Sequence, residues 1–182
     1  MHQTQAKSDK FDSNKGFSLL LAKLPVWSFA AKDPIANLVS DGNNQYMQQC
    51  GDCHSRRLPI ADKTQHVSKR PADYHDLNRL SLMSSELYFE DGQIKDEVFV
   101  ISSYLQSKMA KAGVNCSNCH NPHSDKLRFS GNQTCTQCHS ATTYELPDHH
   151  QHKMDTAGSQ CVNCHIPART YMQVDDRRDH SL

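Results

Sequence analysis

The chain has 182 residues, a length that suits one domain or two very small ones. Only 36% of the residues are hydrophobic, so aliphatic packing alone cannot build a large core. Twenty Lys and Arg balance twenty Asp and Glu, and no basic stripe points to nucleic-acid binding. No run of about 18 apolar residues predicts a membrane span.

Residues 1–45 contain no cysteine, and their first part has the composition of a polar terminus. The most apolar segment, residues 17–31, contains Lys23 and Pro25. It is either a short amphipathic helix followed by a loop or the core of a signal peptide. We favour the helix because the residues before the segment are only weakly basic.

All eight cysteines occur in one repeated pattern, in which two cysteines are separated by two residues and followed at once by histidine. C-x-x-C-H is the attachment signature of c-type haem. Two thiols in one tight turn form thioethers to the porphyrin, and the imidazole that follows binds iron as the proximal ligand. The pattern predicts four haem c groups, held by Cys50, Cys53 and His54; Cys116, Cys119 and His120; Cys135, Cys138 and His139; and Cys161, Cys164 and His165.

Other uses of paired cysteines explain the pattern less well. A zinc ribbon matches the fifteen residues between Cys119 and Cys135, but it does not need a histidine after each pair. A disulfide scaffold leaves the histidines without a use, and a redox-active dithiol needs one pair rather than four.

Between the first and second motifs, residues 94–112 form the one strongly periodic segment, and we predict a helix there. Acidic residues occupy its first turn and lysines its last, and Gly113 is a natural terminator. The helix leads into Cys116, and its stripe is expected to pack on protein or on a haem face. The apolar stripe consists of Ile94, Val98, Ile101, Leu105, Met109 and Ala112.

The last three motifs lie within residues 116–165 and are joined by short loops, and no segment shows the alternation of a strand. We therefore predict a mostly α fold with long loops, little or no β-sheet, and a core organised by the haems. Residues 1–45 are predicted to be a polar terminus with a short helix, and residues 46–182 a tetrahaem cytochrome c domain.

The sixth iron ligand decides what each haem does, since a second histidine closes the site and an open position allows chemistry. His123 follows His120 by three residues and lies too near its own motif to reach the far face of that haem. We predict that it binds a neighbouring iron. At least one of His149, His150 and His152 is expected to bind iron, and the choice among them is left open.

The remaining candidate ligands are weaker. His75 and His66 lie in the gap between the first two motifs, and Met83, Met109, Met154 and Met172 offer thioethers. The arginine pairs at 56–57 and 177–178 either bind haem propionates or are solvated.

Three segments resemble a family of multihaem cytochromes c that carry paired CxxCH motifs: DGQIKDEVFVISSYLQSKM, GVNCSNCHNPHSDKLRFSGNQTCTQCH and CVNCHIPARTYMQVDDRRDHS. The resemblance covers roughly residues 45–182. The CxxCHxPH arrangement is more distantly similar to the nitrite reductase, hydroxylamine oxidoreductase and octahaem tetrathionate reductase group. The resemblance implies closely packed bis-histidine haems, with His123, the 149–152 histidines and His180 as distal ligands. It also implies a periplasmic or extracellular location, because bacteria attach this haem outside the cytoplasmic membrane.

Two functions remain open. The first is an electron carrier, conduit or module of a larger cytochrome, with other cytochromes or redox proteins as partners and with copies able to stack haem to haem. The second is an oxidoreductase with one open haem that reduces a nitrogen or sulfur oxyanion. Tyr88, Tyr104 and Arg79 could line its pocket, but the CxxCK motif of the nitrite reductases is missing. We favour the carrier.

Overall fold

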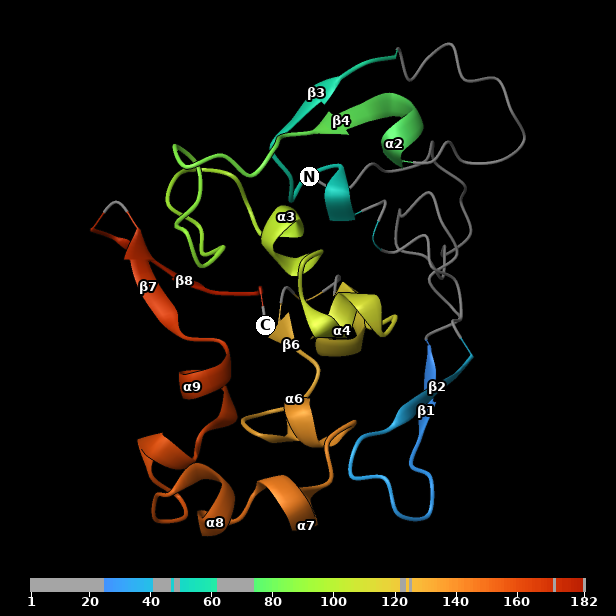
Figure 1. The fold of residues 1–182 in the computed structure, drawn as a ribbon, viewed down its shortest axis with the longest axis vertical. Coiled ribbons are helices and arrows are strands. Elements are labelled where there is room, and N and C mark those ends of the chain that lie inside the picture. Colours follow the sequence, from blue (N-terminus) through green and yellow to red (C-terminus); the bar gives the residue numbers. More distant parts are fainter. Residues whose placement is uncertain are drawn as a thin grey trace, which may run out of the picture. The chain divides into compact units, whose positions relative to one another are not determined.

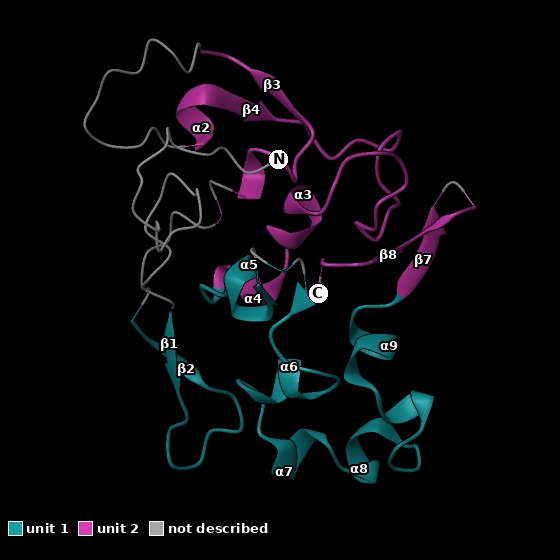
Figure 2. Cartoon of the chain, turned by 180° about the vertical axis from the view of Figure 1, so that it is seen from behind, with its two compact units in different colours: residues 1–46, 112–167 teal, residues 47–111, 168–182 magenta. Residues whose placement is uncertain are grey.

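The computed structural model describes residues 25–40, 47, 50–61, 74–121, 124, 126–171 and 173–181 (Figure 1). The chain forms two compact units (Figure 2). Unit 1 consists of residues 1–46 and 112–167, and unit 2 of residues 47–111 and 168–182. The first haem motif thus belongs to unit 2 and the other three belong to unit 1. The domains predicted at 1–45 and 46–182 stay a prediction.

The described part of unit 1 consists of short helices and two antiparallel strand pairs. Strand β1 (Val26–Ser28) pairs with β2 (Asn37–Ser40), and β5 (His120–Asn121) pairs with β6 (Lys126–Leu127). The helices are α5 (Cys116–Cys119), α6 (Gln133–Thr136), α7 (Ala141–Tyr144), α8 (Pro147–His150), the 3₁₀ turn η2 (Ala157–Ser159) and α9 (Cys161–His165).

Unit 2 is built in the same way. Strand β3 (Arg57–Pro59) pairs with β4 (Asn78–Leu80), and β7 (Ala168–Tyr171) pairs with β8 (Asp175–Arg178), both antiparallel. Its described helices are α2 (Tyr74–Leu77), α3 (Ile101–Tyr104) and α4 (Lys108–Lys111). Among the described residues, no helix is long and apolar enough to cross a membrane.

The buried hydrophobic residues lie almost entirely in unit 2. They are Tyr74, Leu77, Tyr88, Val98, Ile101 and Tyr104, joined in unit 1 by Ala36 alone among the residues that the structure describes. Pro25 of unit 1 is buried too, and the other buried residues in the described part of this unit are polar: Asn115, Ser117, Asn118 and Ser159. In its described part, the unit with three haem motifs therefore buries few apolar side chains.

The helix predicted over residues 94–112 is wrong in its first half. Helical structure is limited to α3 and α4, while Ile94 forms a β-bridge with Tyr88 and Phe99 has a φ of 59°. The backbone of this half bonds elsewhere: the Arg56 amide donates to the Val98 carbonyl at 3.1 Å. These long-range bonds replace the bonds of a helix, whose ladder joins residues four apart.

The predicted end of this segment is confirmed. Helix α4 ends at Lys111, and Gly113 has a φ of +90°, a backbone conformation that glycine adopts at little cost. A side chain at position 113 would also meet Leu38, 2.9 Å from an ideal Cβ.

Candidate haem-binding motifs

Each of the four motifs lies on a short turn. The amide of the motif histidine donates to the carbonyl of the first cysteine in three of them, from His54 at 2.8 Å, from His120, and from His139 at 2.9 Å. In the fourth, helix α9 includes both cysteines and His165. This compact turn brings both thiols and the imidazole to one place, which is the arrangement that attachment to one porphyrin edge requires.

The turn of the second motif is stabilised by its own asparagines. The Asn115 side chain accepts from the Ser117 amide at 3.1 Å, and the Asn118 side chain accepts from the Asn115 amide at 2.9 Å. These two bonds form a capping box at the start of α5. The Arg128 amide donates to the Cys119 carbonyl at 2.8 Å and anchors the far end.

Asn132 joins the third and fourth motifs. Its carbonyl accepts from the Cys135 amide at 2.8 Å, and its side-chain oxygen accepts from the Cys161 amide at 2.9 Å. Its side-chain nitrogen donates to the Ser159 carbonyl at 2.9 Å. Sequence reasoning missed Asn132 because its partners are distant in sequence; its place just before the third motif is a weak signal.

The N-terminal region also supports the third motif. Ile35 forms an antiparallel bridge with His139, the Ala36 amide donates to the Cys138 carbonyl at 2.7 Å, and the Ser140 amide donates to the Pro34 carbonyl at 2.7 Å. A region without a haem motif therefore fixes the backbone on which a proximal histidine is carried.

The thiols of the last three motifs lie close together. Burial and the neighbouring Cys161 raise the pKa of Cys135 to about 12, and burial and Cys119 raise the pKa of Cys138 to about 11. Burial also raises the pKa of the Cys119 thiol. All eight cysteines lie among the described residues, and none of them is in a disulfide.

His149 faces the proximal histidine of the fourth motif. The ring centres of His149 and His165 are 6.1 Å apart and their planes differ by 5°. Two imidazoles that bind one iron from opposite faces have ring centres roughly 6 Å apart, since each metal–nitrogen bond is about 2.0–2.1 Å long. The pair therefore has the separation of two axial ligands of one haem.

An aromatic contact chain positions His149. Its ring meets Tyr144 edge-on at 5.2 Å, and Tyr144 meets His139 edge-on at 5.6 Å. Burial and the nearby His165 lower the pKa of His139, which favours the neutral imidazole that binds iron. The histidines of the third and fourth motifs are thus close to one another.

The other two histidines of the 149–152 cluster contact one another instead. His150 and His152 have ring centres 6.4 Å apart, and the His152 amide donates to the His150 Nδ1 at 3.1 Å. The His152 ring also packs tightly against Gly158, where a Cβ would overlap it. Neither ring is paired with a motif histidine by a described ring contact.

The remaining candidate ligands have different positions. His75 is exposed on α2, next to Tyr74, whose hydroxyl lies 2.7 Å from the Ser55 hydroxyl beside the first motif. His180 is half-buried in the same unit, with its Nδ1 2.8 Å from the Arg178 carbonyl oxygen. Met83 and Met154 are exposed. The predictions for His123, His66 and Met172 fall outside the described residues.

The arginine pairs named above have protein partners. Arg56 lies 3.9 Å from Asp96, Arg57 donates to the Ser55 carbonyl at 3.3 Å, and Arg177 donates to Asp175 at 2.7 Å. Among the described residues, no group of three or more His, Cys, Asp or Glu side chains is arranged to hold a metal ion.

Comparison with known proteins finds one match to a family model. Residues 108–144 match the model of the doubled CXXCH motif, and this range contains the second and third motifs. The match supports a multihaem cytochrome c-type family for the chain, with haem c bound covalently through CXXCH. No curated protein and no solved structure matches. The distant resemblance to the nitrite reductase group therefore stays a prediction.

Proposed function

We propose that the chain binds four haem c groups and transfers electrons through them. It would act as a periplasmic or extracellular carrier or conduit, or as a module of a larger cytochrome. The observation that carries the proposal is that all four CxxCH motifs adopt the compact turn that attachment needs. The doubled motif supports two of these sites directly.

The haem of the fourth motif takes His149 as its distal ligand in this proposal. The ring centres of His149 and His165 have the 6.1 Å separation of two axial ligands, and the stacked rings would turn their nitrogens toward the iron on ligation. His150 and His152, which pack on one another, are then supporting residues. A site closed by two histidines moves electrons and leaves no position for a substrate.

The haems also supply the core of unit 1. Its buried side chains are mainly polar in the described part, whereas several large hydrophobic side chains are exposed: Val39, Leu127, Phe129, Leu146 and Met154. A porphyrin offers these residues an apolar face, so haem binding and folding of this unit form one event.

The proposal also assigns candidate distal ligands to the first haem and to a haem near the second motif. His75 and His180 both belong to unit 2, which contains the first motif, and they are the candidates for the distal ligand there. His123 follows the second motif and is assigned to the iron of a neighbouring haem, which would place two haems within fast electron-transfer distance.

Low-temperature EPR of the oxidised native protein tests the function. Electron transfer through closed sites predicts four low-spin irons and no binding of cyanide or nitrite. A substantial high-spin fraction that binds nitrite would favour the oxidoreductase with one open haem instead.

A further inference from the structure

Two arginines lie directly opposite one another in the β7–β8 hairpin. Arg169 of β7 is the register partner of Arg177 of β8. Side chains at such positions stand on one face of the hairpin, with Cβ atoms about 4.5–5.5 Å apart, and like charges there destabilise the strand pair. The hairpin therefore concentrates positive charge that an anion would neutralise.

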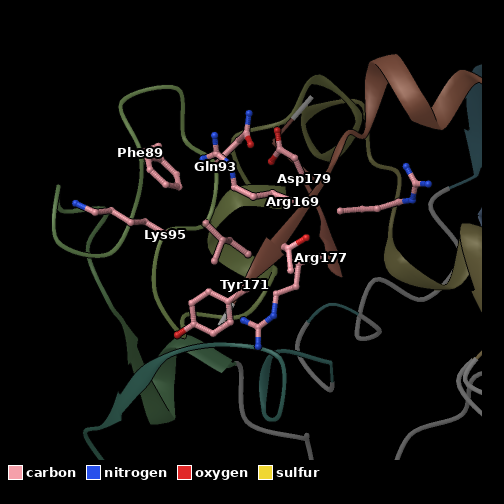
Figure 3. Close-up of a pocket in the computed structure, with 10 residues that line it drawn as sticks. Phe89, Gln93, Lys95, Arg169, Tyr171, Arg177 and Asp179 are labelled. Atoms are coloured by element: carbon pink, nitrogen blue, oxygen red, sulfur yellow. The ribbon is translucent and has the colours of Figure 1, made fainter. Parts of the chain in front are cut away.

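An aromatic ring positions each guanidinium group. The Arg169 guanidinium lies 4.1 Å from the centre of the Phe89 ring, and that of Arg177 lies 4.4 Å from the centre of the Tyr171 ring (Figure 3). Asp175 also accepts from the Arg177 Nε at 2.7 Å. These contacts separate the two charges and fix both side chains, so neither needs to be ordered when a ligand binds.

Both arginines line a pocket of about 260 Å³. Lys95 and Arg178 line it too, and the acidic residue among its described lining is Asp179. The Asp179 carboxylate is already bonded, because it accepts from the Ser181 amide at 3.0 Å and from the Ser181 hydroxyl at 2.7 Å. The Lys95 ammonium donates to the Ser85 carbonyl at 2.9 Å. Positive charge thus dominates the pocket.

The guanidinium of Arg177 has one nitrogen that donates no hydrogen bond. This atom, Nη1, is buried and has no hydrogen-bond partner among the described residues. A buried cationic donor without an acceptor is unfavourable, and a guanidinium is built to donate two parallel N–H groups to an oxyanion. The buried Nη1 of Arg177 therefore indicates that the pocket suits an oxyanion.

We propose that this pocket of unit 2 is a binding site for an oxyanion of the carboxylate class, held by Arg169 and Arg177. Two sources offer this chemistry. One is a propionate of the haem attached at Cys50 and Cys53, a case that rests on the function proposed above. The other is a small free oxyanion from solution.

A chain of polar contacts links the pocket to the first motif. The Tyr171 hydroxyl donates to Asp96 at 3.1 Å, and Asp96 pairs with Arg56 at 3.9 Å, two residues after His54. The Ile101 amide also donates to the His54 carbonyl at 3.2 Å within the same unit. These contacts connect the pocket to the residues beside the first haem motif, which supports the propionate source.

The experiment compares the full haem-loaded chain with Arg169→Gln and Arg177→Gln. Arg79→Gln is the matched control, because Arg79 is exposed on β4 of the same unit and does not line the pocket. Acetate and sulfate are the probes for calorimetric titration, and the midpoint potential of each haem is measured in parallel. Haem content is determined for every variant, so a failure of haem binding is recognised separately.

A free-anion site predicts saturable binding in the native and Arg79→Gln proteins that weakens at least tenfold in both pocket variants. A propionate site predicts no acetate binding, and one haem midpoint that falls in both pocket variants because a positive charge is lost. If the pocket variants match the native protein in both measurements, the proposal is overturned. Should the glutamine variants not fold, Arg169→Lys and Arg177→Lys keep the charge but lose the paired donors. In these lysine variants a free-anion site predicts weaker anion binding, a propionate site predicts a smaller fall of the same haem midpoint, and native values in both measurements overturn the proposal.

Discussion

The side-chain oxygen of Asn132 accepts a hydrogen bond from the amide of Cys161 at 2.9 Å, across 29 residues of sequence. The same side chain donates to the Ser159 carbonyl, and its backbone begins the turn that contains Cys135. One asparagine thus couples the backbones of two haem motifs. Haems attached to these motifs would be held in a fixed relation by the protein as well as by their own contacts.

Replacing Asn132 with alanine should destabilise both motifs together. The change removes two hydrogen bonds and leaves two backbone groups in need of partners, a cost of roughly 1–3 kcal/mol. Chemical denaturation of the haem-loaded protein, followed by haem absorbance, should show a lower midpoint. Gln133→Ala, at the exposed neighbouring position on α6, should change the midpoint little. Equal midpoints for the two variants would show that the Asn132 bridge contributes nothing.

His149→Ala should open the iron of the fourth haem. With its distal imidazole gone, one of the four haems should become high-spin and bind carbon monoxide or cyanide. His152→Ala is the control, since its ring packs on His150 and Gly158 rather than on a motif histidine. The assignment is wrong if His152→Ala opens an iron and His149→Ala does not.

His123→Ala should open a different iron and leave all four attachments intact. The prediction comes from sequence spacing, because His123 is too close to His120 to reach the far face of its own haem. One haem should become high-spin, and its potential should rise because the imidazole donor is lost. An unchanged spin state at every haem would make His123 a surface residue. The His123→Ala/His149→Ala double variant should show two open irons.

The Cys135→Ser/Cys138→Ser double change should unfold unit 1 rather than remove one cofactor from an intact protein. Unit 1 has a mainly polar buried set in its described part, so it lacks an apolar core that could survive the loss. Circular dichroism and the spectra of the remaining haems would record the change. Native helicity with three native haem spectra would contradict the expectation.

The sequence predicts those features of the structure that depend on residues near one another in the chain, and it misses those that depend on distant residues. The compact turns at the CxxCH motifs follow from local spacing, and Gly113 ends α4 as its conformational freedom suggests. The prediction of a helix over residues 94–100 was wrong because the Val98 carbonyl accepts a hydrogen bond from the Arg56 amide, a partner far away in sequence. The Asn132 bridge and the opposed Arg169 and Arg177 depend on tertiary pairing and register, which periodicity does not reveal.

The short strands were missed for a related reason. Pairs such as β5 with β6 involve two residues on each side, too few for an alternating pattern to appear. The proposed choice of His149 over His150 and His152 likewise depends on ring positions, since adjacent histidines are equivalent in composition.

The measurement that most directly tests the account is haem stoichiometry. The chain is expressed with a cytochrome c maturation system, and intact mass is combined with a pyridine haemochrome assay. We expect a mass increased by four haems and the spectrum of haem joined through two thioethers at each site. A protein that matures with fewer than four haems, or that carries zinc at the cysteine pairs instead, would contradict it.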